Sequence, residues 1–122
     1  MPVKKAEKAP GKTEEELIHE CPDIYTFNLL GGKWRLPVIW MLANYGDQRY
    51  NELKRRLTGI TNIMLTRSLN ELEEHGLILR IDYGELPLRV EYSLTQKARD
   101  LLPALDIISI WGRDFVRPEK AT

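Results

Sequence analysis

The chain has 122 residues, 43% of them hydrophobic, which suits one small packed core and excludes a wholly disordered protein. Eighteen Lys and Arg residues balance eighteen Asp and Glu residues, so the net charge is zero, which excludes a protein that holds nucleic acid by bulk positive charge. One cysteine excludes an internal disulfide, two histidines are too few for a strong metal site, and no apolar run approaches the roughly 20 residues of a membrane span. We therefore expect a small cytoplasmic protein without a metal or other cofactor.

The first residues predict a tail followed by two short helices. Residues 1–13 contain four lysines and no apolar pattern, which is typical of a flexible tail. Acidic residues from position 14 onward predict a short helix that is capped by Thr13 and broken by Cys21-Pro22. Asp23 is the predicted N-cap of a second helix over residues 24–30, which Gly31-Gly32 ends.

Residues 33–45 predict the most hydrophobic helix. Pro37 falls in its first turn, where the missing N–H has no helical partner to lose. Apolar side chains cover more than one face, so we expect this helix to be central and buried on most sides. Gly46-Asp47 closes it.

Two further helices are predicted around a short turn that contains glycine. Asn51 is the predicted cap of a short helix over residues 52–57. Thr61 is the predicted cap of a helix over residues 62–75, with Gly76 as its stop. The second helix has a core face made of Leu65, Leu69 and Leu72. Two helices joined in this way form the helix-turn-helix pattern.

The rest of the chain predicts a β-hairpin and a long helical region. Residues 77–83 and 88–94 are rich in β-branched and aromatic residues and flank a four-residue tip, 84–87. Thr95 caps a helical region to about residue 116, which Pro103 is expected to split or kink. Its apolar side chains point several ways, so some of them need a partner outside the core.

Several stretches of the chain resemble the HxlR-type winged helix-turn-helix regulators of bacteria and archaea, within the MarR-like superfamily. The match spans about residues 21–112. The stretches that carry it, in chain order, are Cys21-Pro22, Leu29-Leu30-Gly31-Gly32-Lys33-Trp34, Arg49-Tyr50-Asn51-Glu52-Leu53, Gly59-Ile60-Thr61, Leu65-Thr66-Arg67, Glu71-Leu72-Glu73-Glu74-His75-Gly76-Leu77 and Pro87-Leu88-Arg89-Val90-Glu91-Tyr92-Ser93-Leu94-Thr95.

The resemblance implies an α+β, mainly α fold. It implies a winged helix-turn-helix DNA-binding domain over residues 14–117, with a two-stranded wing, flanking N- and C-terminal dimerisation helices and a C-terminal tail at 118–122. It also implies a homodimer that binds double-stranded DNA at specific sequences to regulate transcription. Relatives often carry a basic residue at position 63 and Arg or Gln at position 68, whereas this chain has Ile63 and Ser68. The operator sequence therefore does not carry over.

The predicted DNA-reading residues lie off the leucine face of the second helix. They are Thr61, Asn62, Ile63, Thr66, Arg67 and Asn70. In the major groove Asn pairs with adenine, Arg pairs with guanine, and Thr or Ile contacts the thymine methyl group. The alternative is an ordinary solvated face, although an exposed isoleucine has no structural purpose there.

The local charge of the helix-turn-helix is a second indication of DNA binding. Between positions 49 and 67 the basic residues are Arg49, Lys54, Arg55, Arg56 and Arg67, against the single acid Glu52. Such a cluster predicts phosphate contacts, whereas the acidic end of the helix at Glu71, Glu73 and Glu74 is expected to point away from DNA. In the wing, Arg89 is predicted either to contact DNA or to pair across the sheet with Asp82 or Glu91; the wing geometry favours DNA.

The dimer and the cysteine complete the prediction. Ile107, Ile110 and Trp111 are the apolar residues expected in the dimer interface.

Cys21 is either a small buried residue or a redox sensor, as in some relatives. A helix dipole would favour its thiolate, while the negative charges of Glu20 and Asp23 would oppose it. The residues indicate no effector molecule.

The chain thus reads as a transcriptional regulator rather than an enzyme, because no catalytic constellation can be named among its residues. The alternative is a winged-helix module for protein–protein assembly that has lost its DNA contact.

Overall fold

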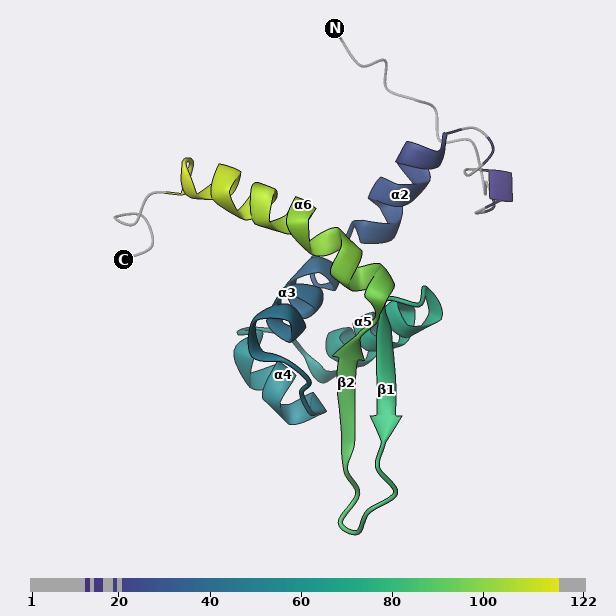
Figure 1. Ribbon diagram of the computed structural model, residues 1–122, viewed down its shortest axis with the longest axis vertical. Helices are drawn as coiled ribbons and strands as arrows, with labels where there is room; N and C mark the ends of the chain where they lie inside the picture. Colours follow the sequence, from purple (N-terminus) through teal and green to yellow (C-terminus); the bar gives the residue numbers. More distant parts are fainter. Residues whose placement is uncertain (1–12, 14, 17–18, 20, 117–122) are drawn as a thin grey trace, which may run out of the picture. The chain divides into compact units, whose positions relative to one another are not determined.

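The computed structural model describes residues 13, 15–16, 19 and 21–116. The chain divides into one unit that ends at Gly32 and a second that begins at Lys33. The second unit contains three helices, a hairpin and a last helix, in that order (Figure 1). Apart from Thr13, the predicted tails at 1–13 and 118–122 lie outside the described residues.

The first unit contains helix α2, Pro22–Leu30. Its N-cap is Cys21, so the N-cap predicted at Asp23 is wrong. The helix begins earlier because Pro22 takes its first position, where proline is favoured and its missing N–H breaks no helical bond. Asp23 lies instead in the first turn, where its negative charge suits the helix dipole. The helix ends at Gly31, as predicted.

Thr13 caps a helical segment, as predicted. The Glu16 N–H donates to Thr13 Oγ1 and the Thr13 N–H donates to Glu16 Oε2, both at 3.2 Å, which is a capping box. Residues 15, 16 and 19 are helical, and the other residues of this predicted helix lie outside the described ones.

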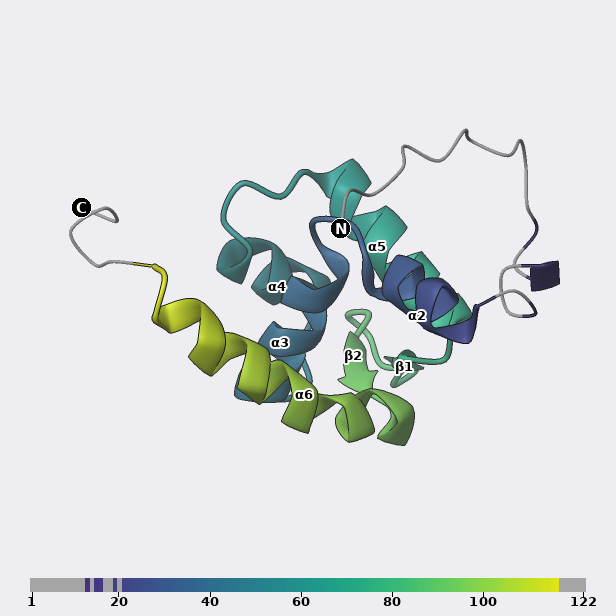
Figure 2. The ribbon, with the colours of Figure 1, turned by 90° about the horizontal axis from the view of Figure 1, so that it is seen from above.

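Helix α3, Arg35–Tyr45, is the central helix of the second unit. It contacts α4, α5, α6 and β2, and it lies between α4 and α6 (Figure 2). Pro37 falls in its first turn, as predicted, although the helix begins two residues later than expected. It ends at Gly46, whose φ of +79° is a conformation that glycine adopts without steric cost.

Helices α4, Tyr50–Arg56, and α5, Asn62–Glu74, form the helix-turn-helix. The cap predicted at Asn51 is wrong, because the Glu52 carboxylate accepts from the Arg49 N–H at 3.0 Å and the helix begins at Tyr50. The cap predicted for α5 is confirmed, since Thr61 Oγ1 accepts from the Met64 N–H at 3.1 Å. α5 ends one residue earlier than predicted.

Strands β1, Ile78–Asp82, and β2, Val90–Leu94, form the antiparallel hairpin, with Ile78 opposite Leu94. The strands are shorter than predicted, and their connection spans 83–89 instead of 84–87. Pro87 has no N–H to offer a neighbouring strand, which limits pairing on this side. A short bridge between Gln48 and Tyr92 adds a pairing that the sequence did not predict.

Helix α6, Gln96–Arg113, closes the second unit. Thr95 caps it as predicted, accepting from the Ala98 N–H at 3.3 Å. Of the split or kink expected at Pro103, the split is wrong, because the helix continues through this residue. Pro103 removes one backbone N–H donor from the helix, and its side chain is exposed.

One hydrophobic core joins these elements. Its members come from α3 to α6, from both strands and from the connections between them: Val38, Ile39, Leu42, Leu53, Leu57, Ile60, Leu65, Leu69, Leu72, Leu77, Ile78, Leu94, Ala98 and Leu105. The predicted leucine face of α5 is therefore confirmed as its core face. Among the described helices, none combines the length and the apolar character needed to cross a membrane.

Candidate nucleic-acid interface

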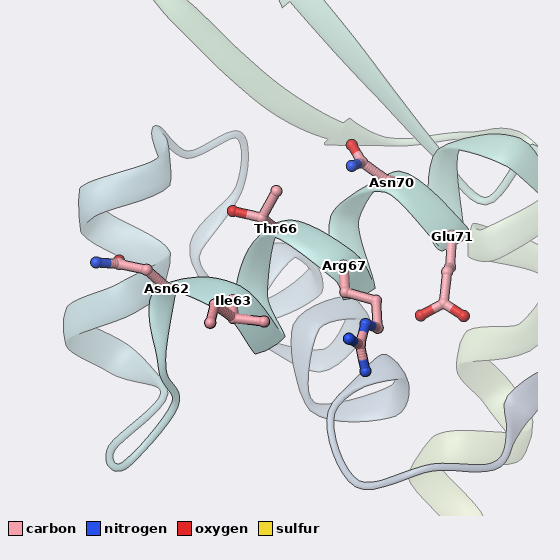
Figure 3. A pocket seen from close by; sticks show the side chains of 6 residues that line it. All are labelled: Asn62, Ile63, Thr66, Arg67, Asn70 and Glu71. Carbon is pink, nitrogen blue, oxygen red and sulfur yellow. The ribbon is translucent and has the colours of Figure 1, made fainter.

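Helix α5 turns one side away from the core. Each residue of a helix rotates by about 100°, so Ile63, Arg67 and Asn70 point away from the buried leucines. This side lines a hollow of about 530 Å³ (Figure 3). We call it the outward face of α5; its residues are Asn62, Ile63, Thr66, Arg67, Asn70 and Glu71. Five of the six predicted DNA-reading residues therefore share one face, and the sixth, Thr61, is the helix cap.

Two polar side chains on this face are available to a partner. Within the described chain, Arg67 and Asn70 make no side-chain hydrogen bond or ion pair. Ile63 beside them is 72% exposed and has no packing role in the core. Ser68, in contrast, is buried, so its departure from the family pattern lies off the outward face.

Tyr50 holds the first turn of α5, which the sequence did not predict. Its hydroxyl lies 3.0 Å from Asn62 Oδ1, 3.1 Å from the Asn62 carbonyl oxygen and 3.3 Å from Thr66 Oγ1. The ring is half-buried and packs against the core from α4. The only available signal was an aromatic residue at the start of a helix, which does not indicate its partner.

One of the three acidic residues at the end of α5 lies on the outward face. Glu71 does not point away from the DNA-reading residues but lines the same hollow as Arg67 (Figure 3). Arg35 of α3 donates from its guanidinium to Glu71 Oε2 at 2.6 Å. This ion pair offsets the Glu71 charge, so the negative side chain on the outward face is already paired.

The basic residues of α4 fall on different sides of the helix. Lys54 is four residues from Tyr50 and therefore shares the side of α4 that reaches α5. Arg55 is exposed, and Arg49 is the exposed N-cap. Within the described residues, neither Lys54 nor Arg55 has a side-chain partner.

Arg56 lies on the opposite side and is already engaged. Its guanidinium donates to Gln48 Oε1 at 2.9 Å and stacks 4.2 Å from the centre of the Tyr45 ring. Gln48 is only 1% exposed, and its amide donates to the Met41 and Gly46 carbonyl oxygens at 2.8 and 3.1 Å. Arg56 thus satisfies a buried side chain, which distinguishes it from the other predicted phosphate ligands.

Arg89 of the wing is also held by carboxylates. Its Nε donates to Glu91 Oε2 at 3.1 Å, and a second nitrogen lies 3.7 Å from Glu85 Oε1. The hydrogen bond to Glu91 raises the pKa of Arg89 above its ordinary value. The predicted pairing with Glu91 is present, but along the strand rather than across the sheet, where Glu91 faces Ile81.

Helix α6 carries an exposed apolar stripe. Ile107, Ile110 and Trp111 follow one another at i, i+3 and i+4, and are 69%, 60% and 64% exposed. By helical periodicity they lie opposite the buried Leu105. The predicted surplus of apolar residues on this helix is therefore present on its surface.

Cys21 is a half-buried free thiol at the N-terminus of α2. In the described part of the chain, no group of three or more His, Cys, Asp or Glu residues could hold a metal ion.

The chain is similar to known proteins over most of its length. Residues 29–120 match the family model described as HxlR-like helix-turn-helix. A putative regulatory protein, MalR of Fusobacterium mortiferum, is 42% identical over 101 residues, covering 83% of this chain and 95% of the relative.

Two solved structures show the same similarity. A putative transcriptional regulator of the MarR family from Porphyromonas gingivalis W83 is 40% identical with a TM-score of 0.74, covering 80% of this chain and 94% of that chain. The redox regulator HypR in its oxidized form is 38% identical with a TM-score of 0.72, covering 77% of this chain and 96% of that chain. The mainly helical fold with a two-stranded antiparallel sheet matches these winged-helix neighbours.

Proposed function

The chain belongs to the HxlR-like helix-turn-helix family of transcriptional regulators, and from that premise we propose that it binds a specific DNA operator as a homodimer. The observation that carries the proposal is the outward face of α5, where Arg67 and Asn70 have no partner among the described residues and Ile63 is exposed. The second helix of a helix-turn-helix lies in the major groove, where these side chains match base edges. Bound near a promoter in the cytoplasm, the protein occludes or assists polymerase.

Phosphate contacts come from the cations that are not already paired. Lys54 and Arg55 of α4 and the N-cap residue Arg49 supply them in this proposal, together with the recognition helix. Arg56 and Arg89 are secondary, because each already binds a side chain of the protein. In a chain of zero net charge, these few cations set the register on DNA and the salt dependence of binding.

Dimerisation covers the stripe of α6. Ile107, Ile110 and Trp111 are large, apolar and exposed on one side of the helix. A two-fold interface buries the same patch of both copies and places two recognition helices about 34 Å apart, one turn of DNA.

The test is binding to genomic DNA fragments across a salt series. We expect selective binding. The logarithm of the binding constant should fall linearly with the logarithm of the salt concentration, with a slope of about −0.9 per phosphate contacted. A module used only for protein–protein assembly would show no salt-dependent DNA binding, and that outcome would refute the proposal. Arg67→Ala is the test variant for the outward face: it is expected to relax the selectivity of binding, and its exposed side chain can be removed without touching the core.

Redox control through Cys21 is a second candidate, favoured by the similarity to the structure named as the redox regulator HypR in its oxidized form. Cys21 is the only cysteine, so a disulfide must join two chains or a small thiol. Either product adds bulk at the start of α2. If α2 borders the dimer interface, such an adduct alters the spacing of the recognition helices.

Treatment with diamide, which takes two electrons and two protons from a pair of thiols, tests this candidate. We expect the affinity for the operator to change in the wild type and to stay constant in Cys21→Ser. Mass spectrometry under non-reducing conditions identifies the linked species. Equal affinity before and after treatment, with Cys21 oxidised, shows that the thiol does not regulate binding.

A further inference from the structure

We propose that Tyr50 is a positioning residue that sets the base preference of Asn62, an inference that rests on the proposed binding of DNA by α5. Tyr50 is the one side chain outside α5 that holds two of the predicted DNA-reading residues in the described chain. Its hydroxyl meets Asn62 Oδ1 at 3.0 Å and Thr66 Oγ1 at 3.3 Å.

The donors and acceptors of this cluster can be counted. A phenol has a single proton, and it points to the two oxygens of Asn62, Oδ1 and the backbone carbonyl. The Thr66 hydroxyl then serves as the donor to the Tyr50 oxygen. One of the two lone pairs of Asn62 Oδ1 is thereby occupied and this oxygen is held towards Tyr50, while the amide nitrogen keeps both hydrogens and points away from Thr66 (Figure 3).

This arrangement changes what Asn62 offers to a base. Pairing of Asn with adenine needs both ends of the amide, because the oxygen accepts from N6 and the nitrogen donates to N7. With Oδ1 held towards Tyr50, the amide presents its nitrogen to a base, so Asn62 acts mainly as a donor. Guanine presents two acceptors, N7 and O6, on the same edge and is the base that suits such a donor.

Asn70 provides the contrast within the same face. Within the described residues its amide makes no hydrogen bond, so both of its ends can face DNA. The adenine pairing expected of an asparagine therefore falls to Asn70, and Asn62 reads guanine instead.

Selection of binding sites from a randomised duplex pool, with the wild type and Tyr50→Phe, tests the inference. The substitution keeps the half-buried ring and removes only the hydroxyl, so the fold is retained; a thermal melt verifies this. We expect guanine at one position per half-site for the wild type. In Tyr50→Phe the freed amide can accept from adenine, and the guanine-to-adenine preference at that position falls on the order of tenfold.

Asn62→Ala assigns the position and supplies the control. In an Asn62→Ala background, adding Tyr50→Phe must leave base preference at that position unchanged. If Tyr50→Phe weakens binding to all sequences equally, or if the wild type already selects adenine at that position, the inference is overturned while DNA binding stands. Absence of selective binding by the wild type refutes the proposed function itself.

Discussion

Arg67 and Glu71 are one helical turn apart on α5, a spacing at which opposite charges normally attract each other. Glu71 is instead bound by Arg35 at 2.6 Å, and Arg67 has no partner within the described chain. The ion pair to α3 therefore leaves the Arg67 guanidinium available on the outward face. The packing of α3 against α5 thus determines that Arg35 pairs with Glu71 and that Arg67 stays unpaired within the described chain.

Arg67→Ala is expected to relax operator selectivity without unfolding the protein. A bidentate contact between Arg and guanine contributes about 1–3 kcal/mol of discrimination, and the side chain is exposed, so its loss opens no cavity. Binding-site selection measures the effect. Arg99→Ala, an exposed arginine on α6, is the control, and unchanged selectivity in Arg67→Ala would remove this residue from the reading set.

Arg55 and Arg56 are neighbours with different roles. Arg56→Ala leaves the buried Gln48 Oε1 without its guanidinium donor, and we expect the free energy of unfolding to fall by about 1–3 kcal/mol. Arg55→Ala removes an exposed side chain and should change stability by less than about 0.5 kcal/mol.

The same two variants separate stability from DNA binding. Arg55→Ala is expected to reduce the slope of binding against salt by about one phosphate contact, whereas Arg56→Ala mainly lowers the urea midpoint. Equal urea midpoints for the two variants would contradict the structural role of Arg56.

At the scale of elements, the helix N-termini show which capping residues can be predicted from the local sequence. Thr61 and Thr95 cap α5 and α6 as their sequences predict, because a threonine hydroxyl accepts from an N–H three residues later. Asn51 and Asp23 do not cap their helices. At these two places a neighbouring residue, Glu52 or Pro22, already satisfies or removes a donor at the helix start.

Replacing Gly76 or Gly112 by alanine is expected to change the stability of the protein in opposite directions. Gly76 has a φ of +71° after α5, so alanine there should destabilise the protein by about 1 kcal/mol. Gly112 lies inside α6 with nothing within 4 Å of an added Cβ, so alanine there should stabilise by about 0.5–1 kcal/mol. Urea unfolding of both variants measures the difference, and the same sign for both would contradict this account.

At the scale of the whole molecule, α6 presents apolar surface in two places. The stripe of Ile107, Ile110 and Trp111 is exposed on one side. A groove of about 300 Å³ lies between α3 and α6, with Trp40 and Ile108 among its lining residues. Within the described residues of the second unit, both the stripe and the groove are open to a partner.

Ile107→Glu combined with Ile110→Glu is expected to yield a folded monomer, because two charges cannot be buried in the proposed two-fold interface. Operator affinity should fall by about a hundredfold or more, since the two half-sites are no longer bound together. Light scattering and DNA binding measure the two effects. Arg99→Glu tests for a general charge effect on α6, and a wild type that is monomeric at micromolar concentration would contradict dimerisation through this stripe.

The sequence by itself determined the order of helices and strands, the leucine face of α5 and five of the six residues on its outward face, all but Glu71. These features follow from periodicity, caps and turn residues, whose physics acts over one or two helical turns. Pro103, like Asn51 and Asp23, is a local signal that the structure does not follow, since α6 continues through it.

Only the tertiary structure decided which polar side chains of the site are occupied. Tyr50 holds Asn62 across 12 positions, and Arg35 holds Glu71 across 36. Arg56 is committed to Gln48, which itself pairs with Tyr92 through the backbone. Such bonds depend on how helices and strands pack, and no local pattern encodes the partner, so the sequence names the candidate residues while packing selects those that remain free to bind.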